Sequence, residues 1–212
     1  MSLLHFFTFN MFSENTYIVA DAFGETAIID PGCMEVQEQQ ILQAFIAEKR
    51  LRPVLLLNTH CHIDHVLGNR FVYDTYGLQP WIHAADQEDL ERLESYGPVF
   101  GIQAMASPAP AGYLKPGGEV AVGTLTFELR EAPGHSAGSI CFINHKDGYV
   151  ISGDVLFEGS IGRTDLPGGN YDTLIQSVKS QLFTLPNEML VYPGHGPATT
   201  IGREKQNNPF FQ

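Results

Sequence analysis

The sequence predicts an α/β fold in which two β-sheets pack face to face and helices cover their outer sides. Strand-like segments fall into two sets, and each set is followed by helical patterns, an order typical of layered sheets with outer helices. The chain has 212 residues, a length that fits one domain of ordinary size. Because no Ser/Pro-rich linker divides it, we expect residues 1–212 to form a single domain.

In the first set, Val54–Leu57 is the clearest strand, because it is a continuous apolar run after Pro53, as in strands buried on both faces. Gly77 is a stop signal for the helix that follows this strand. Strands are expected at residues 3–9, 16–19, 26–29, 54–57 and 80–83. Helices are expected at residues 35–50, 63–76 and 84–96.

The second half repeats this pattern of strands followed by a helix. Between the halves, residues 97–116 are rich in Gly, Ala and Pro and have little periodicity, which predicts a loop or lid. Strands are expected at residues 119–131, 139–144, 149–152 and 189–192, and a helix at 171–185.

The charge of the chain excludes several kinds of partner. It carries 12 Lys and Arg against 24 Asp and Glu, a net charge of −12, which leaves no basic stripe for nucleic acid or an anionic membrane. No apolar run approaches the roughly 18 residues of a membrane span, and residues 1–10 show no signal-peptide pattern. Three isolated cysteines fit a reducing compartment. We therefore expect a cytoplasmic protein that binds neither nucleic acid nor membrane.

Residues 60–65 read His-Cys-His-Ile-Asp-His, directly after a predicted buried strand. Three imidazoles and a carboxylate in six residues favour a divalent ion, above all zinc. His60 and His62 project together from the strand end, whereas Asp64 and His65 lie where the helix begins and point to a neighbouring volume. Since one ion cannot easily use all four side chains, the motif predicts two adjacent metal ions.

Three further residues lie at the ends of predicted strands, each directly after a glycine: His135, Asp154 and His195. Glycine lets the backbone turn sharply, so that the next side chain can enter a shared cavity. Each pair alone is a common turn sequence. Together with residues 60–65, however, they supply five histidines and two aspartates, about the number that two near-tetrahedral sites need when one carboxylate bridges.

These motifs resemble the metallo-β-lactamase superfamily, and within it the glyoxalase II (hydroxyacylglutathione hydrolase) group. The resemblance implies an αββα sandwich. It also implies two divalent ions, for which zinc, iron and manganese all fit, and it places Asp30 in support of the histidine loop. In this family His60, His62 and His135 would hold the first ion, Asp64, His65 and His195 the second, and Asp154 would bridge them. The matching segments are 28–32, 59–69, 132–138, 152–154, 162–169 and 192–200.

The resemblance further implies that a hydroxide shared by the two ions attacks a small-molecule thioester such as S-lactoylglutathione, with Asp64 as a candidate for orienting it. Arg163, in a Gly-rich segment, is a candidate for contacting a substrate carboxylate, and a structural contact with Asp165 in the same turn is the competing interpretation. Classical glyoxalase II enzymes use a C-terminal helical region to bind glutathione, and we expect none here. Lys115, Arg203 and Lys205 are the other candidates for glutathione contacts.

Two alternatives remain open. Persulfide dioxygenases also resemble this chain, and their single iron would be held by His60, His135 and Asp154, a 2-His-1-carboxylate set. A metal-binding protein without catalysis would instead need a closed four-ligand site. Cys61, inside the ligand motif, is expected to point into the core rather than act as a nucleophile, because its neighbouring histidines are committed to metal. The sequence indicates no oligomeric state.

Overall fold

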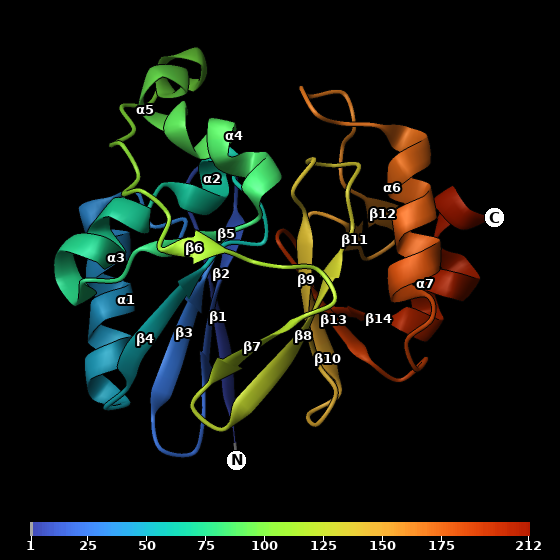
Figure 1. Ribbon diagram of the computed structural model, residues 1–212, viewed down its shortest axis with the longest axis horizontal. Helices are drawn as coiled ribbons and strands as arrows, with labels where there is room; N and C mark the ends of the chain where they lie inside the picture. Colours follow the sequence, from blue (N-terminus) through green and yellow to red (C-terminus); the bar gives the residue numbers. More distant parts are fainter. Residues whose placement is uncertain (1) are drawn as a thin grey trace.

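The computed structural model describes residues 2–212 and shows two six-stranded sheets packed face to face, with helices on both outer sides (Figure 1). The first sheet has the order β1-β2-β3-β4-β5-β6 and the second β14-β13-β10-β9-β8-β7. Both sheets mix parallel and antiparallel pairs. The predicted α/β sandwich is therefore confirmed.

The strands of the first sheet are β1 (Leu3–Phe9), β2 (Glu14–Ala20), β3 (Glu25–Ile29), β4 (Arg52–Leu57), β5 (Pro80–Ile82) and β6 (Gly112–Tyr113). The helices among and after them are α1 (Val36–Glu48), α2 (Ile63–Val66), α3 (Asn69–Tyr76), η1 (Ala84–Asp86), α4 (Gln87–Glu91), α5 (Leu93–Tyr96) and η2 (Gly97–Phe100). The strands of the second sheet are β7 (Glu119–Val122), β8 (Leu125–Glu131), β9 (Ile140–Asn144), β10 (Tyr149–Gly153), β13 (Leu190–Pro193) and β14 (Thr199–Thr200). The remaining elements are the hairpin β11 (Leu156–Phe157) and β12 (Ser160–Ile161), α6 (Tyr171–Ser177), the π-helical turn η3 (Val178–Leu182), α7 (Ile201–Asn207) and η4 (Pro209–Phe211).

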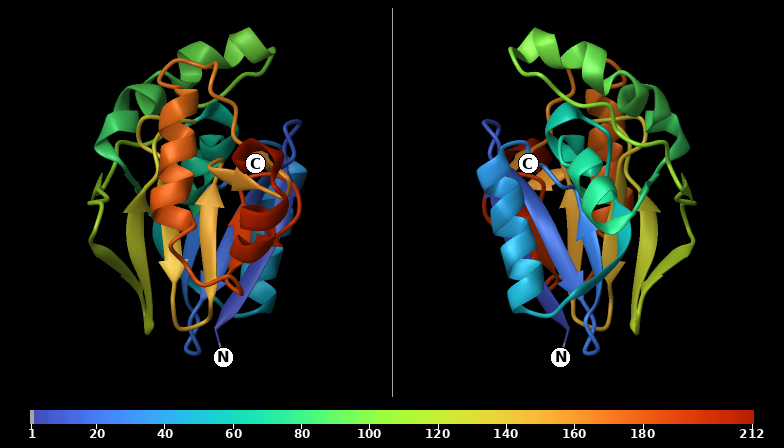
Figure 2. Two further views of the ribbon diagram at one scale, coloured as in Figure 1. Left: turned by 90° about the vertical axis from the view of Figure 1, so that its right-hand side faces the viewer. Right: turned by 90° about the vertical axis from the view of Figure 1, so that its left-hand side faces the viewer.

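Central strands are buried on both faces, because successive side chains alternate between two packed layers. On β2, Tyr17 faces the other sheet and belongs to the same core cluster as Phe127 and Phe142. Its neighbour Ile18 faces outward and packs in the cluster that contains Leu42 of α1. Figure 2 shows the consequence for the whole molecule: α1 and α3 cover the first sheet, and α6 and α7 cover the second.

Strand direction brings four loops to one end of the sandwich. β3 and β4 are parallel, as are β10 and β13, so within each pair the carboxyl ends lie at the same edge. Asp30 follows β3, His60 follows β4, Asp154 follows β10 and His195 follows β13. A backbone bridge between Glu14 and His195 joins the two sheets at this edge.

Two predicted helices are interrupted. The helix expected at 63–76 divides into α2 and α3 at Gly68, whose N–H donates to the carbonyl of Pro31. A Cβ at Gly68 would lie 2.6 Å from Cys33 Sγ, so the chain must pass close to the turn after β3 rather than continue as a helix. The helix expected at 84–96 is divided into η1, α4 and α5.

Other differences concern short elements that hydrophobic periodicity does not reveal. The strand region 119–131 is a hairpin of β7 and β8. The helix expected at 171–185 ends as the turn η3, and β11, β12, β14 and α7 were not predicted. The expected loop at 97–116 contains η2 and also β6, which pairs with β5; its movement as a lid stays a prediction. No helix in residues 2–212 is both long and apolar enough to cross a membrane.

Candidate metal centre

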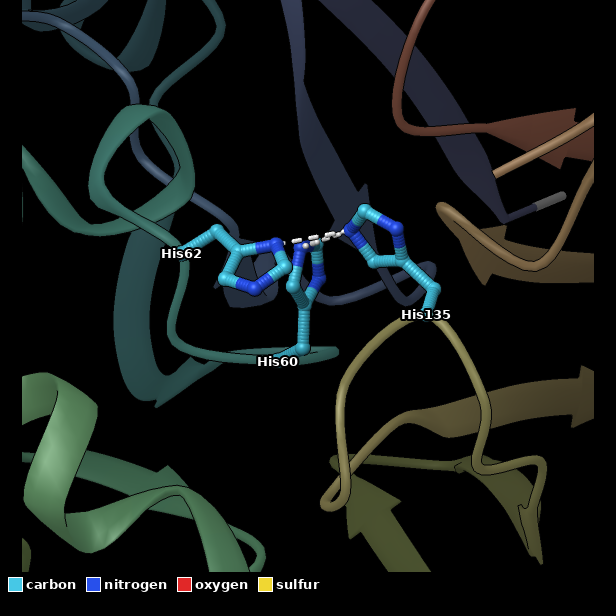
Figure 3. Close-up of side chains that lie close together, drawn as sticks. All are labelled: His60, His62 and His135. Atoms are coloured by element: carbon cyan, nitrogen blue, oxygen red, sulfur yellow. Dashed lines mark hydrogen bonds between the residues drawn. The ribbon is translucent and has the colours of Figure 1, made fainter. Parts of the chain in front are cut away.

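Three imidazoles converge between the two halves of the molecule and form the first donor set: His60, His62 and His135. His62 Nδ1 lies 2.7 Å from His135 Nε2, which is 3.2 Å from His60 Nε2. Figure 3 shows that His60 and His62 come from the loop after β4 and His135 from the loop before β9. The ring nitrogens therefore face one small volume from opposite sides.

Asp64, His65 and His195 form a second donor set beside the first. Asp64 Oδ2 lies 3.0 Å from His195 Nε2 and 3.6 Å from His65 Nε2. His65 is fully buried, whereas His195 is partly exposed. In the second set, His65 of α2 is thus the deep donor, and His195 of the loop after β13 is a shallower one.

Asp154 lies between the two sets. Its Oδ1 is 3.0 Å from His195 Nδ1 and 3.5 Å from His65 Nε2. Its Oδ2 is 3.5 Å from His135 Nε2. The two oxygens of one carboxylate therefore face different donor sets, the arrangement that a bridging ligand requires.

Outer contacts fix which nitrogen of His60 and of His65 faces the donor sets. Thr59 Oγ1 donates to Asp30 Oδ2 at 2.6 Å, so it is an acceptor for His60 Nδ1 at 3.0 Å. His65 Nδ1 lies 3.1 Å from the same Asp30 oxygen. These contacts hold the Nδ1 protons of His60 and His65, make Nε2 of each ring the nitrogen that can bind a metal, and fix the orientation of both rings. Thr59 was not predicted, since a threonine at a strand end carries no distinctive signal.

The two donor sets differ in charge in the metal-free protein. Burial lowers the pKa of His60 well below its usual value and the pKa of His135 to about 4. At His195 burial opposes the charged form, but the hydrogen bonds to Asp154 and Asp64 outweigh burial and raise the pKa of His195 to about 9. Burial also opposes charge at His65, but the same two carboxylates raise its pKa well above the usual value. The second set therefore holds protons at pH 7, whereas the first set does not.

The residues present fit a divalent metal ion. His65 Nε2 is buried and has no hydrogen-bond partner among the described residues, an arrangement that costs free energy unless another group approaches. Imidazole nitrogens with carboxylate oxygens suit zinc, and they also suit iron and manganese. The first set would hold one ion, the second set another, and Asp154 would contact both.

The three glycines before ligands serve two different purposes. Gly134 has a φ of 128° and Gly153 a φ of 52°, so both supply the sharp turn expected from the sequence. Gly194 has no such positive φ, and the expectation of a glycine-only turn is wrong there. Instead, a Cβ at Gly194 would lie 2.2 Å from Asp154 Oδ1, so the glycine allows the backbone to approach the carboxylate of Asp154.

Comparison with known proteins agrees with this geometry. The family model for the metallo-beta-lactamase superfamily matches residues 10–195, which include both donor sets. The chain belongs to the metallo-β-lactamase superfamily. The family and the donor sets together make it a metallo-hydrolase that binds divalent ions.

Relatives within the superfamily are similar over nearly the whole chain. Hydroxyacylglutathione hydrolase GloC of Haemophilus influenzae is 36% identical over 202 residues, which cover 94% of this chain and 93% of that protein. The structure of the BLEG-1 B3 metallo-beta-lactamase has a TM-score of 0.91 at 32% identity and covers 99% of this chain and 100% of its own. The structure of TTHA1623 in a di-iron-bound form has a TM-score of 0.87 at 35% identity and covers 97% of this chain and 99% of its own.

Five of the seven donor residues of this superfamily member line a pocket of about 230 Å³, as in an enzyme that must admit a substrate; His60 and His65 lie behind them and do not line it. Its wall is mainly aromatic and aliphatic, and Arg163 is the one Lys or Arg residue in its lining. Arg163 makes two 2.7 Å hydrogen bonds to Asp165, so the structural contact weighed from the sequence is present. The lining residues are Phe12, His62, Ile63, Asp64, Tyr96, Phe100, His135, Asp154, Arg163, Leu166 and His195.

The structure does not bring the other basic candidates to this pocket. Lys115 lines a separate depression beside Trp81. Arg203 Nη2 pairs with Glu158 Oε1 at 2.8 Å. Lys205 donates to a backbone carbonyl and a side-chain amide near its own helix. None of these three side chains lines the pocket. A substrate bound there would therefore contact other residues.

Cys61 is buried between two ligands of the first set, as expected for a core residue. Burial raises the pKa of its thiol well above the usual value, so the side chain is a protonated thiol and a poor nucleophile. Its backbone N–H donates to Asp86 Oδ2 at 3.0 Å. The residue contributes to the site through its backbone rather than its sulfur.

Proposed function

We propose that this protein hydrolyses a small-molecule thioester, such as S-lactoylglutathione, with two divalent ions bound side by side. Zinc is the first choice, and iron and manganese are the alternatives. The observation that carries the proposal is the position of Asp154, which lines the pocket and whose two oxygens face different donor sets. The similarity to GloC, a hydroxyacylglutathione hydrolase, supports the choice of substrate.

Two ions bound at these sets would lower the pKa of a water molecule and polarise the substrate carbonyl. Asp64 lines the pocket beside His195, so it is placed to accept a hydrogen bond from the attacking water and orient it. The aromatic side chains of Phe12, Tyr96 and Phe100 pack edge to face and form one wall. This wall would exclude water and hold the apolar part of the substrate.

A thioester suits this pocket because its leaving group needs little help. A thiol has a pKa of about 8.5, so the thiolate departs with little protonation. An amine leaving group would need a proton donor. Arg163 uses two of its five N–H donors on Asp165, so the remaining donors can reach a substrate carboxylate while this pair is intact.

A second candidate is a single-iron persulfide dioxygenase. His60, His135 and Asp154 are close enough to form its ligand set. His135 Nε2 lies 3.2 Å from His60 Nε2 and 3.5 Å from Asp154 Oδ2. This candidate would leave the second donor set unused and His65 Nε2 without a partner, which favours the two-metal hydrolase. A non-catalytic zinc protein is favoured still less, because the donor sets open into a pocket.

The decisive experiment combines elemental analysis with two assays on the same preparation. We expect about two divalent ions per chain and hydrolysis of S-lactoylglutathione or another member of a thioester panel. The matched variant His195→Ala should retain the first ion and lose the second together with hydrolysis. One iron per chain, with oxygen consumption and sulfite formation on glutathione persulfide, would replace the hydrolase by the dioxygenase.

A further inference from the structure

A buried aspartate outside the donor sets is hydrogen-bonded to both loops that carry the first set. Asp86, the last residue of η1, is 0% exposed, and no Lys, Arg or His among residues 2–212 lies within salt-bridge distance of it. Its carboxylate is satisfied by three hydrogen-bond donors instead. Oδ2 accepts from the N–H of Cys61 at 3.0 Å, and Oδ1 accepts from the N–H of Gly138 at 2.7 Å and from Ser136 Oγ.

These three donors belong to the two loops that carry the first donor set. Cys61 stands between His60 and His62, and Ser136 directly follows His135. The first loop comes from the half of the chain that contains the first sheet, and the second leads into β9 of the other sheet. One carboxylate therefore ties together two loops whose ligands must meet at about 3 Å. Hydrogen bonds to a charged acceptor are roughly twice as strong as neutral ones.

Gly138 shows how closely the second loop approaches this carboxylate. A Cβ at residue 138 would lie 2.6 Å from the carboxyl carbon and from Oδ1 of Asp86. Any side chain there would push the loop away from Asp86. Glycine is thus required at 138 for the approach itself, and its φ is not in the left-handed region.

We propose that Asp86 is a positioning residue for the first donor set, where it sets the distance between the His60–His62 loop and His135 and so the affinity for the first metal ion. Within residues 2–212 the hydrogen-bond partners of Asp86 are Cys61, Ser136 and Gly138, none of which is a metal ligand, so Asp86 acts through the loops. The proposal rests on the metal sites described above and does not depend on the identity of the substrate.

Asparagine cannot take over this role, although it has nearly the same shape. Both carboxylate oxygens accept hydrogen bonds from backbone N–H groups, one on each loop. An amide has a single acceptor oxygen, so its NH₂ group would face either Cys61 N–H or Gly138 N–H, donor against donor. Asp86→Asn therefore releases one loop and leaves the packing volume unchanged.

The chain offers a matched control at the other end of the sandwich. Asp21 is 6% exposed, and it too joins the two sheets by accepting backbone N–H groups, from Phe23 and Glu25 on one side and Thr124 on the other. It follows β2, which is antiparallel to β3, so it lies at the end opposite to the donor sets. Asp21→Asn thus perturbs the same kind of link far from the metal ligands.

The test is a Co²⁺ titration of metal-stripped full-length protein, followed by visible absorption and by competition with a chelator. His62→Ala and His195→Ala identify the spectrum and affinity of each donor set. For Asp86→Asn we expect affinity at the first set to fall roughly 10–100-fold, as for other changes outside the ligand shell, with a changed Co²⁺ spectrum. The second set, and both sets in Asp21→Asn, should keep their affinities.

Three results would overturn the proposal. These are unchanged affinity at the first set in Asp86→Asn, equal losses at both sets, or an equal loss in Asp21→Asn. Far-ultraviolet circular dichroism establishes that each variant is folded. If Asp86→Asn does not fold, Ser136→Ala removes only one of the three bonds, and it should still weaken the first set selectively; no effect there would count against the role of Asp86. Cobalt binding is measured without substrate. The test of Asp86 therefore remains valid even if the protein does not hydrolyse thioesters.

Discussion

Asp30 Oδ2 lies 3.1 Å from Nδ1 of His65, while Nε2 of the same ring has no hydrogen-bond partner in residues 2–212. The carboxylate thereby holds the Nδ1 proton and directs the other nitrogen toward Asp64 and Asp154. Asp30 also accepts hydrogen bonds from the N–H and the hydroxyl of Thr59. One buried aspartate thus orients ligands of both donor sets, directly at the second and through a threonine at the first.

Asp30→Asn should weaken metal binding with little backbone strain. Asp30 has a φ of 50°, a conformation that asparagine tolerates better than most residues. The amide keeps one acceptor and loses the charge, so we expect roughly 10–100-fold weaker metal binding. Metal content after dialysis against a chelator measures the loss. Asp30→Ala should be worse, because alanine adds strain at this φ; equal metal content in all three proteins would contradict the role of Asp30.

Asp154→Asn should remove most of the hydrolytic activity and one of the two ions. Its carboxylate is the group whose oxygens face both donor sets, so the amide halves the acceptor capacity and removes the bridging charge. The loss should exceed the roughly 10–100-fold typical of changes outside the ligands. Elemental analysis and thioester hydrolysis on the same sample test this expectation. A variant with two ions and full turnover would refute the bridging arrangement.

The metal affinity of the second donor set should depend on pH near neutrality, whereas the affinity of the first set should not. His195 holds a proton up to a pKa of about 9 in the metal-free protein, whereas His135 loses its proton at about 4. A raised pKa means that metal competes with a proton, so affinity at the second set should rise with pH until about 9. Co²⁺ titrations from pH 6 to 9 measure both affinities. Parallel pH dependences at the two sets would show that their protonation does not differ.

Arg163→Ala separates a substrate contact from a structural ion pair. Arg163 and Asp165 are both exposed, so their pairing adds at most about 1 kcal/mol to stability, and the melting temperature should barely change. If the guanidinium binds a substrate carboxylate, KM for S-lactoylglutathione should rise about tenfold or more, with kcat retained. The backbone carbonyl of Arg163, which lies 2.8 Å from His135 Nδ1, remains in place when the side chain is removed.

Asp165→Asn is the complementary variant, because it releases the guanidinium of Arg163. We expect KM for an anionic thioester to fall, and KM for a neutral thioester to stay the same. Unchanged KM values in both variants would leave Arg163 with only the structural contact that its hydrogen bonds to Asp165 describe.

Most of the fold was predictable because hydrophobic runs and turn residues are local signals. The strands at 3–9 and 54–57 and the helix at 35–50 appear as β1, β4 and α1, within a few residues. The interrupted helix at 63–76 was not predictable, since Gly68 breaks it to pass close to Cys33 and Pro31, residues distant in the chain. The small strands β11, β12 and β14 carry too few residues for a periodic pattern.

The sequence by itself determined which side chains are available as metal donors, because five histidines and two aspartates in short motifs are typical of metal binding. Only the tertiary structure decided which oxygen of Asp154 faces which set, that Arg203 and Lys205 have partners elsewhere, and that Asp86 joins the two ligand loops. The physical reason is that ligand identity depends on side-chain type and local spacing. Orientation and support depend on hydrogen bonds between segments that meet only when the two sheets pack.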